Sequence, residues 1–300
     1  MSSAVELRAP GPRGIPPLLA RLVDDAALFP PGNAPMPEAV RGHLEARTGP
    51  HAGVVGLFLC PASRLPELIS ELVRARPSAP VKLSLVIDTG LGGVPKAVSI
   101  VESRRELLDL RMVEMPAPTD VDDVWLERVA EFVPEDAIRV LEPRRPSAGD
   151  HASGAGVPRG QWLASVRKVA EHGCWPKLRC GGATAEAFPS VEEVSDFLAV
   201  ATTTGVPFKA TAGLHHAVRH HDEETGFQHH GFLNLLMATA RSLSGRDVRA
   251  ALDSTDAAAL AEEARALPEP AAQAVRAVFA SYGSCSLSEP IEDLEGLGLL

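Results

Sequence analysis

Short apolar runs recur along the chain, and most are followed by a segment in which apolar residues repeat with helical periodicity. The seven clearest runs predict buried strands at residues 53–60, 81–87, 109–115, 137–142, 177–180, 208–211 and 283–287. A weaker eighth candidate, interrupted by two aspartates, lies at residues 22–29. Near-continuous apolar strands that alternate with helices are typical of a parallel sheet that is covered on both faces.

The spacing of these runs distinguishes between two α/β folds. The runs that begin at residues 53, 81, 109 and 137 are each 28 residues apart, close to one strand–helix unit. Eight such units in 300 residues fit a (β/α)8 barrel, which typically needs about 250 residues plus insertions. An open doubly wound sheet would carry a glycine-rich phosphate loop after its first strand, and the sequence has neither a GxGxxG nor a P-loop motif. We therefore predict an α/β fold with a single TIM barrel over residues 1–300.

The segments between the strands predict the helices of the barrel at residues 64–76, 95–106, 121–132, 161–172 and 191–203. The longest interval, residues 214–282, separates the seventh and eighth strands and predicts a helical insertion. Its alanine-rich helices are expected at residues 231–244, 246–252, 257–267 and 271–280, and a short closing helix is expected after Pro290. Residues 143–160, rich in proline and glycine, predict a loop over the carboxyl end of the fifth strand.

Composition narrows the class of protein without identifying its chemistry. The net charge of −10 argues against a protein that binds nucleic acid through phosphate neutralisation. No apolar run approaches the ~18 residues of a membrane helix, and the first residues lack the apolar core of a secretory signal. The four cysteines are scattered, as in a reduced compartment. We expect a cytoplasmic protein that binds a small anionic metabolite, with no nucleic-acid or membrane partner, and whose alanine-rich helices could form a homo-oligomer contact.

Cationic side chains stand at the ends of two neighbouring predicted strands, in PKLRCGG (176–182) and PFKATAGLHH (207–216). Strand alternation places Lys177 with Arg179 on one face, and Lys209 with Thr211 on one face. Like-charge repulsion and burial would lower the pKa of a lysine here and produce a neutral, nucleophilic amine. The structural alternative is that both lysines form ion pairs with glutamates on the neighbouring strands.

Three glutamates lie one or two residues before a proline at the strand exits RMVEMP, RVLEPR and SLSEP: Glu114, Glu142 and Glu289. They could hold a divalent metal or neutralise the lysines, and Asp25 is a possible fourth member. Histidines form a second group. His215 and His216 directly follow the seventh strand, and His230 opens a helix.

Together, these residues give two candidate sets. A zinc, iron, manganese or magnesium ion could be held by His215, His216 and His230, with Glu289 or Glu142 as the carboxylate. His220 could supply a further imidazole to that set. The loop HHDEETGFQHH, with His220, His221 and His229, reads as a solvated polar segment. For a site at the carboxyl ends of the strands, we assign catalysis to Lys177, Lys209, His216 and Glu142. Substrate binding is assigned to Arg179, Thr211, Asp25, His230, Asn234 and Ser284.

The segments LFPPGN, KLRCGG, FKATAGLHH and HGFLN resemble a group of bacterial barrel proteins of uncharacterised activity. Locally, KLRCGG and FKATAG also resemble the paired lysine strands of class I aldolases of the deoxyribose-phosphate aldolase type. That resemblance implies that Lys177 forms a Schiff base with the substrate and that Lys209 tunes it.

Three functions remain open at this point. The first is a lyase of aldolase type in which Arg179 binds a carboxylate or phosphate and His216 moves a proton. The second is a metal-dependent hydrolase or isomerase, so the cofactor is either absent or a divalent metal. The third is a barrel that binds a metabolite or a partner without catalysis.

Overall fold

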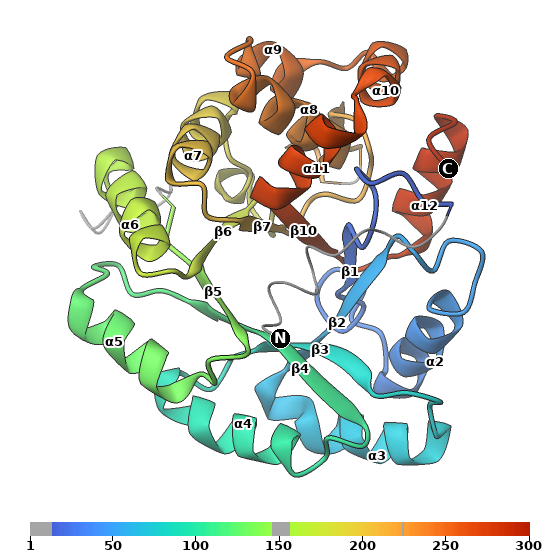
Figure 1. The fold of residues 1–300 in the computed structure, drawn as a ribbon, viewed down its shortest axis with the longest axis vertical. Helices are drawn as coiled ribbons and strands as arrows, with labels where there is room; N and C mark the ends of the chain where they lie inside the picture. The colour runs from blue at the N-terminus through green and yellow to red at the C-terminus, as the bar shows by residue number, and fades with distance from the viewer. Residues whose placement is uncertain (1–13, 146–156, 224) are drawn as a thin grey trace.

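Eight parallel strands close into a barrel in the computed structural model, which describes residues 14–145, 157–223 and 225–300. Around the barrel the order is β1-β10-β7-β6-β5-β4-β3-β2 (Figure 1). The strands are β1 Val23–Asp25, β2 Val55–Pro61, β3 Val81–Val86, β4 Leu108–Pro116, β5 Ile138–Glu142, β6 Trp175–Arg179, β7 Phe208–Thr211 and β10 Phe279–Ser284. The predicted (β/α)8 fold is confirmed, and the weak eighth candidate is the first strand.

Helices lie outside the barrel and connect one strand to the next (Figure 1). They are α2 Met36–Ala46, α3 Leu65–Ala75, α4 Val94–Glu102, α5 Asp123–Phe132, α6 Arg159–Glu171 and α7 Val191–Thr204. Short 3-10 turns, Ala62–Arg64, Leu91–Gly93 and Ala185–Ala187, precede three of them.

Capping residues set the ends of these helices. The predicted helix at 121–132 begins at Asp123 because the side chain of Asp122 accepts the backbone N–H of Trp125. In α7, Ser190 and Glu193 form a capping box, and Gly205 ends the helix in the left-handed conformation.

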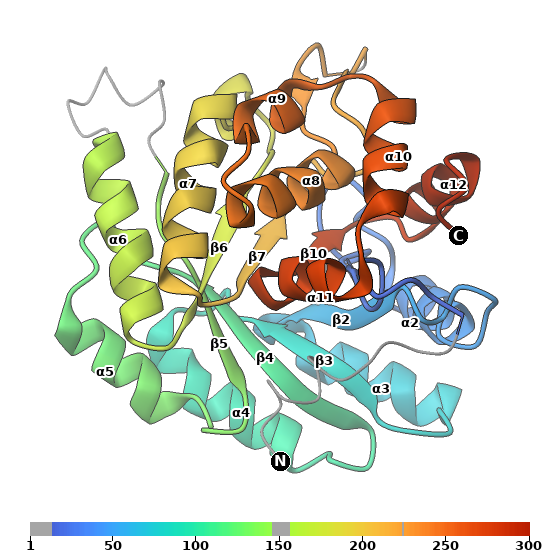
Figure 2. The same cartoon turned by 45° about the horizontal axis from the view of Figure 1, so that its top comes forward.

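The predicted insertion between the seventh and eighth barrel strands is present (Figure 2). It begins with a two-stranded antiparallel hairpin, β8 His220–His221 and β9 Gln228–His229, which the sequence did not predict. The helices α8 Phe232–Leu243, α9 Val248–Asp253, α10 Ala257–Ala266 and α11 Glu269–Val278 follow, and α8 packs against α7 and the other three. The chain closes with α12 Ser288–Gly296.

The last barrel strand differs from its prediction. It spans Phe279–Ser284 rather than 283–287, because α11 ends at Val278 and the strand begins at the next residue. The Phe279 ring stacks on Phe208 of the neighbouring strand, with 4.8 Å between ring centroids. An apolar run that passes from helix to strand without a turn gives no signal of the boundary.

The interior of the barrel has two layers of different chemistry. Met112, Val140 and Trp175, together with Leu57 and Ile138, form an apolar cluster. On the same faces of β4, β5 and β6, two residues further along, stand Glu114, Glu142 and Lys177. The apolar residues therefore fill the amino end of the barrel, and charged side chains fill the part nearer the carboxyl end.

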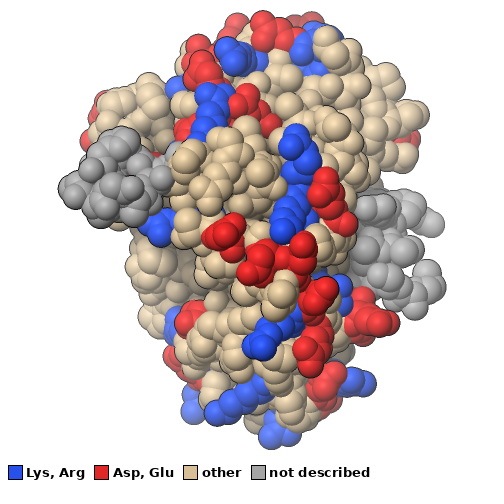
Figure 3. Space-filling view, turned by 90° about the vertical axis from the view of Figure 1, so that its left-hand side faces the viewer, with Lys and Arg blue, Asp and Glu red and all other residues tan. Residues whose placement is uncertain are grey.

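The outer surface carries charged side chains of both signs. On the side shown in Figure 3, basic and acidic side chains are interspersed. Within the described ranges, no helix has both the length and the apolar character needed to cross a membrane. The loop predicted at 143–160 falls largely, and the amino-terminal segment almost entirely, outside the described residues.

Candidate active site

A chain of alternating charges crosses the inside of the barrel. Lys209 Nζ lies 2.7 Å from Asp24 Oδ2 and contacts Glu114 Oε1 on its other side. The second oxygen of Glu114 lies 2.9 Å from Lys177 Nζ, which is 3.3 Å from Glu142 Oε2. Glu142 Oε1 then accepts a 2.6 Å hydrogen bond from Arg179 Nε. Three carboxylates and three cations thus alternate from β1 to β6.

Exposure rises steadily along this chain toward the carboxyl end of the barrel. The exposed fraction of the side chain is 0% for Lys209, 8% for Lys177, 17% for Glu142 and 48% for Arg179. Solvent and small molecules therefore reach the Arg179 end of the chain first. Glu114 is fully buried, and its Oε2 faces Lys177 without an aligned hydrogen bond.

The electrostatics correct the expectation of a neutral lysine at Lys209. Burial alone would lower the pKa of Lys209, but Asp24 and Glu114 outweigh it, and the pKa is raised. Burial would likewise raise the pKa of Glu114, yet Lys177 and Lys209 hold it well below its usual range. The pKa of Glu142 is lowered by Lys177 and Arg179 against the effect of burial. The ion-paired alternative is therefore the arrangement present.

Neighbouring strands supply polar groups that hold the innermost carboxylates. Asp24 Oδ1 accepts the backbone N–H of Leu57 at 2.7 Å, and its Oδ2 accepts the hydroxyl of Ser281 at 2.6 Å. The hydroxyl of Ser84 donates to Glu114. Asp24, Ser84 and Ser281 were not among the predicted site residues. For Asp24, the signal available in the sequence was the pair of aspartates in an otherwise apolar strand.

At the outer end, Thr211 stands opposite Arg179 and Gly283 in the strand register. Ser284 ends β10 and accepts a hydrogen bond from the N–H of Ser286. Gly213 has a φ of +66°, and a Cβ there would lie 2.7 Å from the carbonyl oxygen of Cys180. This glycine is required because the loops after β6 and β7 touch each other.

Three predicted substrate-binding residues lie apart from this chain of charges. Asp25 accepts the N–H of Ala27 and lies 3.0 Å from His43 Nδ1 of α2. His230 is buried, and its Nε2 donates to the carbonyl of Pro189 at 2.7 Å. Burial lowers the pKa of His230 to about 4, so its imidazole is neutral near pH 7.

Asn234 is the third of these residues. Its Oδ1 accepts the N–H of Arg219 at 2.7 Å, and its Nδ2 donates to the carbonyls of Ala251 and Ser254 at 2.7 and 2.8 Å. These contacts tie the hairpin to the turn after α9.

The histidine and glutamate set predicted to hold a metal is not brought together. His215 lies 3.1 Å from Glu289 and 3.6 Å from Cys285 Sγ. His216 instead lies 3.2 Å from Asp293. Hydrogen bonding to Cys285 makes the largest contribution to raising the pKa of His215 to about 8, and Glu289 adds to it.

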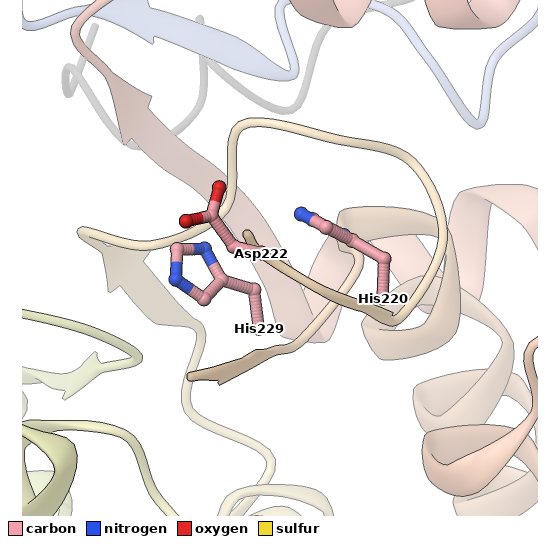
Figure 4. Close-up of side chains that lie close together, drawn as sticks. All are labelled: His220, Asp222 and His229. Carbon is pink, nitrogen blue, oxygen red and sulfur yellow. The ribbon is translucent and has the colours of Figure 1, made fainter. Parts of the chain in front are cut away.

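A different group of ligands forms on the hairpin. Within the described part of the chain, the cluster of at least three histidine, cysteine, aspartate or glutamate residues suited to a metal ion is His220, Asp222 and His229. Their ligand atoms all lie within 4.8 Å of one another (Figure 4). The sequence predicts a solvated loop here and groups His220 only with His215, His216 and His230, because strands of two residues leave no hydrophobic pattern from which their pairing could be predicted.

The protein is thus a (β/α)8 barrel. Toward the carboxyl ends of its strands it carries two groups of ionisable side chains, the chain of charges from Asp24 to Arg179 and the metal-ligand cluster on the hairpin. Neither protein-family models nor curated proteins gave a match to this chain.

Proposed function

We propose that this protein is an enzyme that cleaves a small, anionic, oxygen-rich metabolite by lyase-type chemistry at the carboxyl end of the barrel. The observation that carries the proposal is the alternating chain from Asp24 to Arg179, which runs from the buried interior to the strand ends. Buried ion pairs are often no more stabilising than apolar residues of similar volume. A chemical role therefore explains a charged barrel interior better than stability does.

Arg179 is the group suited to bind the anionic part of the substrate. Its side chain is half-exposed, and Glu142 fixes it by accepting from Nε. A guanidinium has five donors in a planar fork that matches a carboxylate or phosphate. The donors that Glu142 does not use can bind such a group.

Lys177 is the group suited to stabilise negative charge on the substrate. Glu114 Oε2 and Glu142 Oε2 lie 2.9 and 3.3 Å from Lys177 Nζ and fix its position. Lys209 is fully buried between two carboxylates, so it acts as a positioning residue rather than touching substrate. A preorganised ammonium beside a developing enolate lowers the barrier to its formation.

The bond changes follow from these placements. A base, for which His216 beside Asp293 is the candidate, takes the proton of a hydroxyl two carbons from a carbonyl. The bond between the hydroxyl-bearing carbon and the carbon next to the carbonyl then breaks. The hydroxyl-bearing carbon leaves as an aldehyde, and the electron pair of the broken bond forms an enolate opposite Lys177. The protonated base returns its proton to the enolate carbon, which completes the reaction, regenerates the base and consumes no oxidant or reductant.

The test is a panel of 4-hydroxy-2-keto acids and phosphorylated hydroxy ketones, with cleavage followed by proton NMR. Arg179→Gln is expected to raise KM, and Lys177→Met to lower kcat, because one side chain binds the ground state and the other the enolate. Borohydride treatment during turnover distinguishes the mechanisms. Absence of a covalent adduct supports the ammonium role, whereas an adduct lost in Lys177→Met supports a Schiff base. Cleavage unaffected by both substitutions would place the reaction elsewhere.

A further inference from the structure

The hairpin β8–β9 brings three potential metal ligands to one face. His220 and His229 are directly opposite each other in the antiparallel register. Asp222 follows His220 by two residues, so strand alternation directs it to the same side, whereas His221 is directed to the other. Figure 4 shows the three side chains pointing toward one another. The three side chains therefore lie together because of the hairpin register, and not merely because this segment is rich in histidine.

Hydrogen bonds already select the ligand atoms. His220 Nδ1 lies 3.0 Å from the carbonyl oxygen of Val218. Because a carbonyl can only accept, Nδ1 carries the proton and Nε2 keeps its lone pair. The hydroxyl of Thr225 donates to Asp222 and lies 3.1 Å from His229 Nε2. With the proton of His229 on Nε2, its Nδ1 lone pair is the ligand atom. Such supporting bonds are characteristic of metal sites.

The barrel holds the hairpin in place. The backbone N–H groups of Phe232 and Leu233 donate to the carbonyls of His216 and Ala217. The ring of His229 stacks on Phe188, which belongs to the loop after β6, at 4.4 Å between centroids. The three ligands thus sit on a braced segment at the same end of the barrel as Arg179.

We propose that His220, Asp222 and His229 bind one divalent first-row transition ion. Two imidazoles and one carboxylate suit zinc or iron(II) and leave positions open for water or substrate, whereas magnesium and calcium prefer oxygen ligands alone. In a tetrahedral zinc site neighbouring ligand atoms are about 3.4 Å apart, so the ligand atoms, which lie within 4.8 Å of one another, would close by up to about 1.4 Å on binding. The ring of His216 lies edge-on to that of His220, with 4.8 Å between the ring centroids, so it adjoins the metal site.

Direct binding tests this site independently of any activity. The full chain, stripped with chelator, is titrated with Zn²⁺, with Co²⁺ and, as a negative control, with Mg²⁺. We expect one Zn²⁺ per chain and a Co²⁺ visible spectrum of low coordination number. Asp222→Asn and His220→Ala should weaken Zn²⁺ binding by about 100-fold or more, and Thr225→Val by about 10–100-fold.

His221→Ala is the matched control, because it removes an imidazole from the same strand but from the opposite face. Its affinity for Zn²⁺ should equal that of the unchanged chain, and circular dichroism should show that every variant is folded. The site would be overturned if Asp222→Asn bound Zn²⁺ as tightly as the unchanged chain. It would also be overturned if His221→Ala lost as much affinity for Zn²⁺ as His220→Ala. Lys177→Met and Arg179→Gln should retain Zn²⁺, so a failed cleavage assay and a failed metal site give different results.

Discussion

Gly56 of β2 lies directly against the carboxylate of Asp24, and a Cβ at position 56 would overlap Asp24 Oδ1. The innermost charge of the barrel therefore depends on the absence of a side chain on the next strand. Gly56→Ala must displace Asp24 from Lys209 or shift the strand.

We expect Gly56→Ala to lower the free energy of unfolding by about 1–3 kcal/mol, the usual effect of overpacking, measured by urea denaturation. Gly42→Ala is the matched control. Gly42 lies in α2 with no atom within 4 Å of the added Cβ, so this change should stabilise the protein by up to about 1 kcal/mol. Equal effects of the two substitutions would contradict the packing assigned to Asp24.

Removal of Lys209 should be strongly destabilising, because Asp24 and Glu114 would lose the cation between them. Loss of one partner from a buried ion pair typically costs about 3–5 kcal/mol. Lys209→Met is expected to fall in that range by chemical denaturation. Adding Glu114→Gln restores the balance of charge and should recover part of the loss. If the double variant shows simply the sum of two losses, the two charges are not coupled.

Stability should fall at alkaline pH because of His215. Its pKa in the folded protein is raised to about 8 from an ordinary value near 6.5. A base whose pKa is raised on folding contributes stability that is fully present below its unfolded pKa, here about 6.5, and that is lost as the pH rises through its folded pKa of about 8. The contribution is at most about 2 kcal/mol. His215→Gln should flatten the unfolding free energy between pH 6.5 and 8, and an unchanged slope in that variant would contradict the contribution assigned to His215.

Asn234 should prove to be structural. Asn234→Ala removes three hydrogen bonds from a buried amide. The expected loss is about 3 kcal/mol, since each buried partner left unsatisfied costs about 1 kcal/mol or more. Gln273→Ala, which removes an exposed amide, should change stability by less than about 0.5 kcal/mol. A large rise in KM for Asn234→Ala without loss of stability would instead return it to the substrate site.

The barrel was predictable from sequence because its strands are apolar and its helices amphipathic, and both patterns follow from burial. The exceptions have physical causes. In β1, Val-Asp-Asp breaks the apolar pattern because Asp24 faces a charged interior while Asp25 binds His43. At β10, the apolar run of α11 continues into the strand without a turn.

The site was predictable only in part. Lys177, Arg179 and Glu142 could be grouped because strand ends of a barrel share one edge. The pairing of each lysine with a particular carboxylate depends on the strand register and on which side chains are long enough to cross the barrel. Neither can be predicted from the local sequence. The roles of His220 and His229 required knowledge that the two residues face each other across a hairpin.

The salt link between Asp24 and Lys209 also constrains the order in which the molecule can be assembled. During synthesis the first strand emerges long before its counter-ion, which is 185 residues further along the chain, and Ser281 arrives later still. Until then, burial of Asp24 would leave an unmatched anion in an apolar surrounding. The first strand of the barrel is thus among the last elements to settle.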